Sequence, residues 1–209
     1  DHFNGFAKYW EISADDKNGL NGMWYKGPGE SLLKIIIFEK IGDEIILAED
    51  LGEAYDEAKK LRNIFGIPGM KILQFSFGDG KPLEDMVNNT VLYTGTHDNN
   101  TSLGWYNEKP GISNTDSIKN HIKSRNKAKK YLGLDESIGV SWSMIKYAMN
   151  SEAYFCIIPL QDILGLDSSA RMNTPGTIGD NWIWRYNEEC LNKIIKKQFK
   201  DMTKETKRI

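Results

Sequence analysis

An apolar run that ends abruptly in a cluster of polar side chains occupies residues 91–106, VLYTGTHDNNTSLGWY. Val91, Leu92 and Tyr93 favour a strand, and a short apolar run between polar segments is typical of a strand buried on both faces. Five side chains that can hydrogen-bond a polyhydroxylated ligand follow it: His97, Asp98, Asn99, Asn100 and Thr101. A parallel β/α unit presents an active site in this way, at the carboxyl end of its sheet.

The rest of the chain alternates predicted strands with predicted helices. Strands are predicted over residues 44–48, 72–77, 91–93 and 154–159. Helices are predicted from Ser31 onward and over residues 53–65, 117–132, 141–149 and 188–204, whereas residues 3–30 are interpreted as loop-rich and aromatic. Spacings between strands that are too long for hairpins indicate a parallel β/α architecture.

Polar residues follow three of the predicted strands directly. Glu49 follows the first, His97 and Asp98 follow the third, and Gln161 and Asp162 follow the fourth. The carboxyl ends of parallel strands share one face of a sheet, and in a (β/α)8 barrel that face carries the chemistry. The three positions are therefore expected to converge. Four strands do not close such a barrel.

Composition gives no reason to expect several classes of partner. The 209 residues are 40% hydrophobic and 27% charged, which suffices for a sizeable core. The formal net charge of −2 gives no reason to expect nucleic acid or an anionic membrane as partner. No apolar run approaches the roughly 18 residues of a membrane span. Cys156 and Cys190 make no disulfide framework, which favours a reducing, cytoplasmic compartment.

Several kinds of catalytic site are excluded by spacing. The histidines and cysteines lack zinc-ligand spacing, and no G-x-S-x-G elbow occurs. A calcium loop at Asp98 fails because Leu103 and Lys109 stand where glycine and glutamate are required. The phosphate-loop pattern also fails, since Pro82 replaces its Ser or Thr. The spacing therefore gives no support for a zinc, calcium or phosphate-loop site.

The chemistry that remains is that of carboxylates beside aromatic surface. Asp1, Glu49 and Asp98 are the candidate acids, in a chain with 11% aromatic residues. Glycosidic-bond chemistry needs an acid to protonate the leaving oxygen, a carboxylate at the anomeric carbon, and flat apolar faces for sugar rings. Trp10, Trp24, Trp105, Trp182 and Trp184 are each assigned to core packing in preference to such sugar platforms.

Motifs along nearly the whole chain make the resemblance to a known family specific. The matching segments are residues 1–3, 5–6, 9–12, 26–29, 48–52, 65–71, 93–99, 103–106, 159–162, 170–176 and 181–182. In these segments the sequence resembles the amylomaltase and disproportionating-enzyme family, the 4-α-glucanotransferases of glycoside hydrolase family 77.

The resemblance implies a fold, a reaction and three catalytic roles. The fold is a (β/α)8 TIM barrel, of which residues 1–209 resemble the C-terminal half, about strands 5 to 8, with the N-terminal half outside this chain. The reaction is retaining transfer of α-1,4-glucan segments between malto-oligosaccharides without metal or cofactor. Asp1 matches the nucleophile, Glu49 the general acid/base and Asp98 the transition-state stabiliser. Half a barrel exposes sheet edges, so these residues alone are expected to be inactive.

Further side chains are assigned to substrate binding, each beside a structural alternative. The candidates are His97, Asn99, Phe75, Gln161, Asp162 and Asn173. His97 has the alternative of a core histidine, and Asp50 is interpreted as structural. Two other functions stay open: a hydrolytic α-glucosidase or amylase relative, and a non-catalytic glucan-binding remnant. The sequence leaves the oligomeric state undetermined.

Overall fold

A computed structural model describes residues 2–41, 46–52, 55–78, 82–83, 88–108, 115–134 and 137–208. The chain divides into two compact units. The first unit comprises residues 1–70 and 89–91, and the second unit comprises residues 71–88 and 92–209. The strands β3 (Gly69–Ile72) and β4 (Thr90–Tyr93) each have residues assigned to both units.

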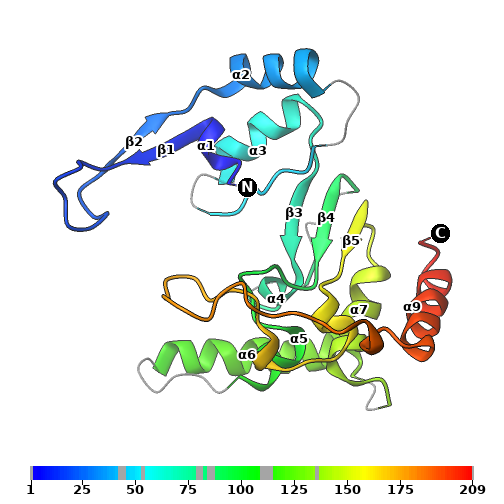
Figure 1. The fold of residues 1–209 in the computed structure, drawn as a ribbon. Coiled ribbons are helices and arrows are strands. Elements are labelled where there is room, and N and C mark those ends of the chain that lie inside the picture. Colours follow the sequence, from blue (N-terminus) through cyan, green and yellow to red (C-terminus); the bar gives the residue numbers. More distant parts are fainter. Residues whose placement is uncertain are drawn as a thin grey trace. The chain divides into compact units, whose positions relative to one another are not determined.

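The first unit contains short helices and carries a two-stranded hairpin (Figure 1). Its elements are α1 (Asn4–Ala7), β1 (Lys8–Glu11), β2 (Met23–Lys26), α2 (Gly29–Ile35), the π-helical turn η1 (Ile36–Ile41) and α3 (Tyr55–Ile64). Its buried core consists of Phe3, Leu33, Ala48, Ala58, Leu61 and Ile67. Ala58 and Leu61 come from α3, as the three-residue spacing of apolar positions predicts for one helix face.

The hairpin corrects the prediction that residues 3–30 are loop-rich. β1 and β2 pair antiparallel, with Tyr9 opposite Tyr25 and Trp10 opposite Trp24. The tyrosine ring centroids are 6.0 Å apart and the tryptophan ring centroids 5.4 Å apart. Cross-strand aromatic pairs of this kind stabilise a sheet, but they become visible only once the strands are paired. The strands are short and the segment 12–22 separates them, so no local pattern reveals the register.

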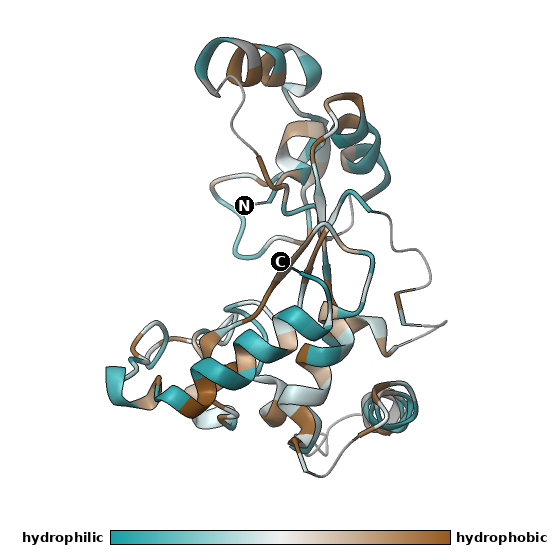
Figure 2. Ribbon diagram, turned by 90° about the vertical axis from the view of Figure 1, so that its right-hand side faces the viewer, coloured by the Kyte–Doolittle hydropathy of each residue, from teal (hydrophilic) through white to brown (hydrophobic). Residues whose placement is uncertain are grey.

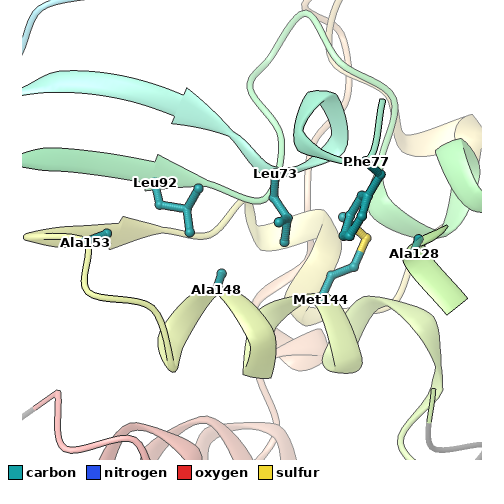
Figure 3. Close-up of a cluster of buried hydrophobic side chains, with 7 residues drawn as sticks. All are labelled: Leu73, Phe77, Leu92, Ala128, Met144, Ala148 and Ala153. Atoms are coloured by element: carbon teal, nitrogen blue, oxygen red, sulfur yellow. The ribbon is translucent and has the colours of Figure 1, made fainter. Parts of the chain in front are cut away.

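The second unit is a sheet covered by helices. Three strands lie in the order β3, β4, β5 (Phe155–Ile157), and Figure 3 shows them running in the same direction. Its helices are α4 (Leu73–Ser76), α5 (Ser102–Asn107), α6 (Thr115–Leu132), α7 (Gly139–Met149), α8 (Leu160–Ile163) and α9 (Lys193–Glu205), with 3-10 turns η2 (Ser168–Ala170) and η3 (Glu188–Cys190).

The main core of the second unit lies between the sheet and α7 (Figure 3). It contains Leu73, Phe77, Leu92, Ala128, Met144, Ala148 and Ala153. The ring of Trp105 stacks on Phe77 with the centroids 5.6 Å apart, so the prediction that Trp105 packs in the core is confirmed. Trp10, Trp24 and Trp182 are 42%, 44% and 53% exposed, and the core prediction is wrong for them.

Most predicted elements of the second unit are confirmed, with two exceptions. The strand predicted over 72–77 ends at Ile72, and Leu73–Ser76 forms a helical turn instead. A short apolar run does not distinguish a buried strand from a buried helix, and Leu73 and Phe77 are both fully buried at a helical spacing of four. The helix predicted from 188 begins at Lys193, because the Asn192 side chain accepts hydrogen bonds from the amides of Ile194 and Ile195.

The strand predicted over residues 44–48 is absent from the described part of that segment. Residues 44 and 45 lie outside the described residues, and residues 46–48 have no strand structure.

The exposed lysines of α9 give this helix the largely hydrophilic colouring seen in Figure 2. Within the described ranges, no helix combines the length and apolar character that crossing a membrane requires.

Candidate active site

In the second unit, the loop that follows β4 forms a tight turn that displays two polar side chains. The Asn99 carboxamide oxygen accepts hydrogen bonds from the Thr96 amide at 2.9 Å and from the Thr96 hydroxyl at 2.8 Å. This Asn side chain fixes the turn in the manner usual for short polar residues. The side chains of His97 and Asp98 are each 48% exposed, so His97 is not a core histidine.

The Asp98 carboxylate is held by residues distant in sequence. The Asn173 side-chain amide donates to Asp98 Oδ1 at 2.5 Å, and Nε2 of His97 lies 3.4 Å from the same oxygen. Arg171 Nη2 donates to the Asp98 backbone carbonyl at 2.6 Å, and Arg171 Nε donates to the Asn173 carbonyl at 2.8 Å. These contacts fix the orientation of a half-exposed carboxylate, a group that can stabilise positive charge.

Beside this loop lies a cavity of about 140 Å³. Its lining residues are Thr96, His97, Asn99, Asn100, Thr101, Pro159, Gln161, Asp162, Arg171 and Met172. The Trp182 ring packs against His97 with 4.9 Å between centroids. Arg171 is absent from the predicted site residues, although a cation two residues before Asn173 is a usable signal. The cavity combines amides, an imidazole and a guanidinium, which suit a ligand rich in hydroxyl groups.

Gln161 and Asp162 are buried, in contrast to Asp98. Asp162 is 1% exposed, and its carboxylate accepts hydrogen bonds from Thr94 Oγ1, the Ser102 amide and Ser102 Oγ at 2.6, 2.7 and 2.8 Å. Burial raises the pKa of Asp162, although these three hydrogen bonds favour its ionised form. Gln161 is 9% exposed and donates to the Ala170 carbonyl at 3.2 Å.

Phe75 differs from these residues in its position. The structure places it on α4 and not at a strand end, and it is 62% exposed. It is not among the side chains that line the cavity. The ring offers a free apolar face, and its assignment to substrate binding stays a prediction.

In the first unit, Glu49 sits at the start of a segment anchored to the beginning of the chain. Its carboxylate accepts from the His2 amide at 2.5 Å and from the Leu51 amide at 3.2 Å. The Glu49 carbonyl accepts from the Phe3 amide at 2.7 Å. The side chain is 28% exposed, so the carboxylate is partly withdrawn from solvent yet accessible.

The neighbouring Asp50 is structural, as predicted. It is 1% exposed, and its Oδ2 lies 3.0 Å from Nε of Arg62, which is 5% exposed. The Met70 amide donates to Asp50 Oδ1 at 3.0 Å, and Arg62 Nη1 donates to the Ile67 carbonyl at 2.8 Å. This buried ion pair fixes the backbone immediately after Glu49.

The predicted convergence of the three acids stays a prediction. Asp1 lies outside the described residues, and Glu49 and Asp98 belong to different units. Among the side chains that the structure describes, no group of three or more His, Cys, Asp or Glu residues could hold a metal ion.

Comparison with known proteins identifies relatives along the whole chain. Residues 1–192 match the profile of glycoside hydrolase family 77, described as 4-alpha-glucanotransferase. The chain is 42% identical to a 4-alpha-glucanotransferase of Synechocystis over 198 residues, 92% of the chain and 37% of the relative. It is 40% identical to a 4-alpha-glucanotransferase of Streptococcus pneumoniae, with 100% of the chain and 40% of the relative aligned.

A solved structure is similar over the same extent. Amylomaltase from Streptococcus agalactiae, solved in complex with acarbose, matches 99% of the chain with a TM-score of 0.85 and 32% identity. The match covers 40% of that amylomaltase, so the chain spans well under half of the proteins it resembles. The predicted fold class, part of a (β/α)8 barrel, is confirmed.

Proposed function

This chain belongs to the 4-alpha-glucanotransferases of glycoside hydrolase family 77, and from that premise we propose that the protein transfers α-1,4-glucan segments between malto-oligosaccharides. The proposed mechanism is a retaining double displacement without metal or organic cofactor. The observation that carries the proposal is the half-exposed Asp98 carboxylate, held by Asn173 at the carboxyl end of β4. A fixed carboxylate there stabilises the oxocarbenium-like charge of glycosyl transfer.

Asp1 and Glu49 supply the two remaining roles in this proposal. Asp1 attacks the anomeric carbon while Glu49 protonates the departing glucan oxygen, and a covalent glycosyl-enzyme forms. Glu49, now a carboxylate, deprotonates the 4-hydroxyl of an acceptor glucan, which attacks the anomeric carbon and releases Asp1. The partial exposure of Glu49 and the backbone amides on both its carboxylate oxygens support this role, because they orient an accessible acid.

The cavity in the second unit supports the assignment of polar side chains to sugar hydroxyls. His97, Asn99 and Gln161 line it, and Asn173 directly follows the lining residues Arg171 and Met172 in the chain. We assign Phe75 to an apolar contact with a sugar ring because its ring is exposed. Asp162 lines the same cavity. A cytoplasmic location and a place in the metabolism of glycogen, starch or maltose complete the proposal.

The test follows the products that the full-length gene product forms from maltotriose. Transfer creates glucose and longer chains while the number of reducing ends stays constant, whereas hydrolysis increases that number. A rise in reducing ends that matches glucose release identifies a hydrolase. Unchanged maltotriose together with retained glucan binding identifies a non-catalytic glucan-binding protein.

Glu49→Gln tests the acid/base assignment. We expect a loss of at least about 100-fold in transfer rate, because general acid and base catalysis contributes about that much or more. Binding of maltoheptaose should be retained. Glu57→Gln is the matched control, since Glu57 is an exposed glutamate of the same unit, paired with Lys8 at 2.9 Å. Full activity in the Glu49 variant would refute the assignment.

A further inference from the structure

The two loops that carry the Asp98 site are both tied to one helical turn. α8 contributes adjacent side chains, Gln161 and Asp162, which are 9% and 1% exposed. Asp162 contacts the two ends of the loop that follows β4, and Gln161 contacts Ala170, the last residue of η2. The turn itself is braced, since the Leu166 amide donates to the Gln161 carbonyl at 2.9 Å.

Asp162 accepts hydrogen bonds from residues at both ends of the loop that carries His97 and Asp98. Thr94 is the first residue after β4, and Ser102 is the first residue of α5. Both donate to Asp162 Oδ2, through their hydroxyl groups at 2.6 and 2.8 Å, and the Ser102 amide donates to Oδ1 at 2.7 Å. One carboxylate therefore sets the distance between the two ends of the loop.

The Gln161 side chain holds the second segment by a hydrogen bond to a backbone carbonyl of that segment. Its side-chain amide donates to the carbonyl of Ala170, the residue before Arg171. Arg171 and Asn173 then reach Asp98, at its backbone carbonyl and at its carboxylate. The two segments meet at Asp98, and both are anchored to α8.

We propose that Asp162 and Gln161 are positioning residues that set the orientation of the Asp98 carboxylate. The proposal rests on the proposed transferase function and changes two of its assignments. Asp162 acts through Thr94 and Ser102, and Gln161 acts through Ala170, and neither acts by contact with sugar. The occupied oxygens of Asp162 and its 1% exposure argue for this role. Thr94 and Ser102 are themselves fully buried and do not line the cavity, so they are separable from substrate contact.

The experiment removes the donors and leaves Asp162 in place. In the full-length gene product, Thr94→Val deletes the hydroxyl at nearly constant volume, and Ser102→Ala deletes the second one. We expect each to lower kcat for maltotriose disproportionation by about 10-fold or more, because small misplacement of a reacting group is costly. KM should change by less than about twofold, since uniform binding is untouched. Thr94→Ser, which keeps the donor, should recover at least half of kcat.

Two readouts separate positioning from a loss of stability. Ile145→Val, in the buried core on α7, lowers the melting temperature without reaching the loop, and its kcat should be unchanged well below that temperature. The double variant Thr94→Val with Asp162→Asn should lose no more kcat than the more severe single variant, because both changes act through the same carboxylate.

A third readout does not depend on activity. Amide hydrogen exchange in the peptide spanning residues 94–102 should accelerate in Thr94→Val and Ser102→Ala but not in Ile145→Val. Unchanged exchange there, or full kcat in both donor variants with loss only in Asp162→Asn, would overturn the positioning role in favour of direct substrate contact. A wild-type protein that does not redistribute maltotriose would instead refute the transferase function, whatever the exchange data show.

Discussion

The buried ion pair between Asp50 and Arg62 allows a quantitative test of how the segment carrying Glu49 is held. The side chains are 2% and 6% exposed, and the charged atoms are 3.0 Å apart. A Cβ on Gly69 would lie 2.6 Å from Asp50 Oδ2 and 2.7 Å from Arg62 Cζ, so the chain packs directly onto the pair. Neither charge can move to solvent without opening the first unit.

Arg62→Met removes one charge and leaves the other buried. The Asp50 carboxylate then retains the Met70 amide, and the Ile67 carbonyl loses its donor. Breaking a buried pair in this way lowers the free energy of unfolding by about 3–5 kcal/mol. The double change Asp50→Leu with Arg62→Met replaces both charges by apolar groups, and buried pairs replaced in this way are often neutral in stability. The double variant should therefore be more stable than Arg62→Met alone.

The assay is urea-induced unfolding followed by tryptophan fluorescence, with the midpoint and slope fitted separately. The matched control is Lys34→Met, which breaks the ion pair between Lys34 and Glu30. That pair is closer, at 2.7 Å, but its side chains are 57% and 48% exposed. Exposed pairs contribute about 0–1 kcal/mol. Equal losses in Arg62→Met and Lys34→Met would refute the reasoning, because burial would then make no difference.

Two further predictions concern titration and reactivity. Burial raises the pKa of Asp162, so its protonated form stabilises the fold fully below the ordinary value of 3.8, and that contribution is lost as pH rises through the folded-state pKa. The free energy of unfolding of wild type minus that of Asp162→Asn should therefore fall as pH rises from 3.8. Urea-induced unfolding at several pH values measures this difference, and an increase in the difference with pH would contradict the prediction. Iodoacetamide should modify exposed Cys190 faster than Cys156, because burial raises the pKa of the Cys156 thiol. Mass spectrometry of timed digests checks the order, and equal rates would contradict it.

The sequence determined the elements whose signal is local. The apolar run ending at Tyr93 became β4, and Ser141 to Met149 lies within α7, because hydrophobic periodicity and short-range hydrogen bonding are written in neighbouring residues. The motifs around Glu49 and Asp98 also identified the family before any coordinates. Asn192 would have placed the start of α9, since a helix cap is a local signal as well.

The tertiary structure alone decided which polar groups are exposed and which are buried. Asp98 and Asp162 are both acids that follow a strand, yet one is half exposed and the other is buried under Thr94 and Ser102. Thr94 and Asp162 are separated by 68 residues in the chain, so no local pattern could pair them. The role of a carboxylate depends on its solvation and its hydrogen-bond donors, and both are fixed only when distant segments of the chain pack against each other.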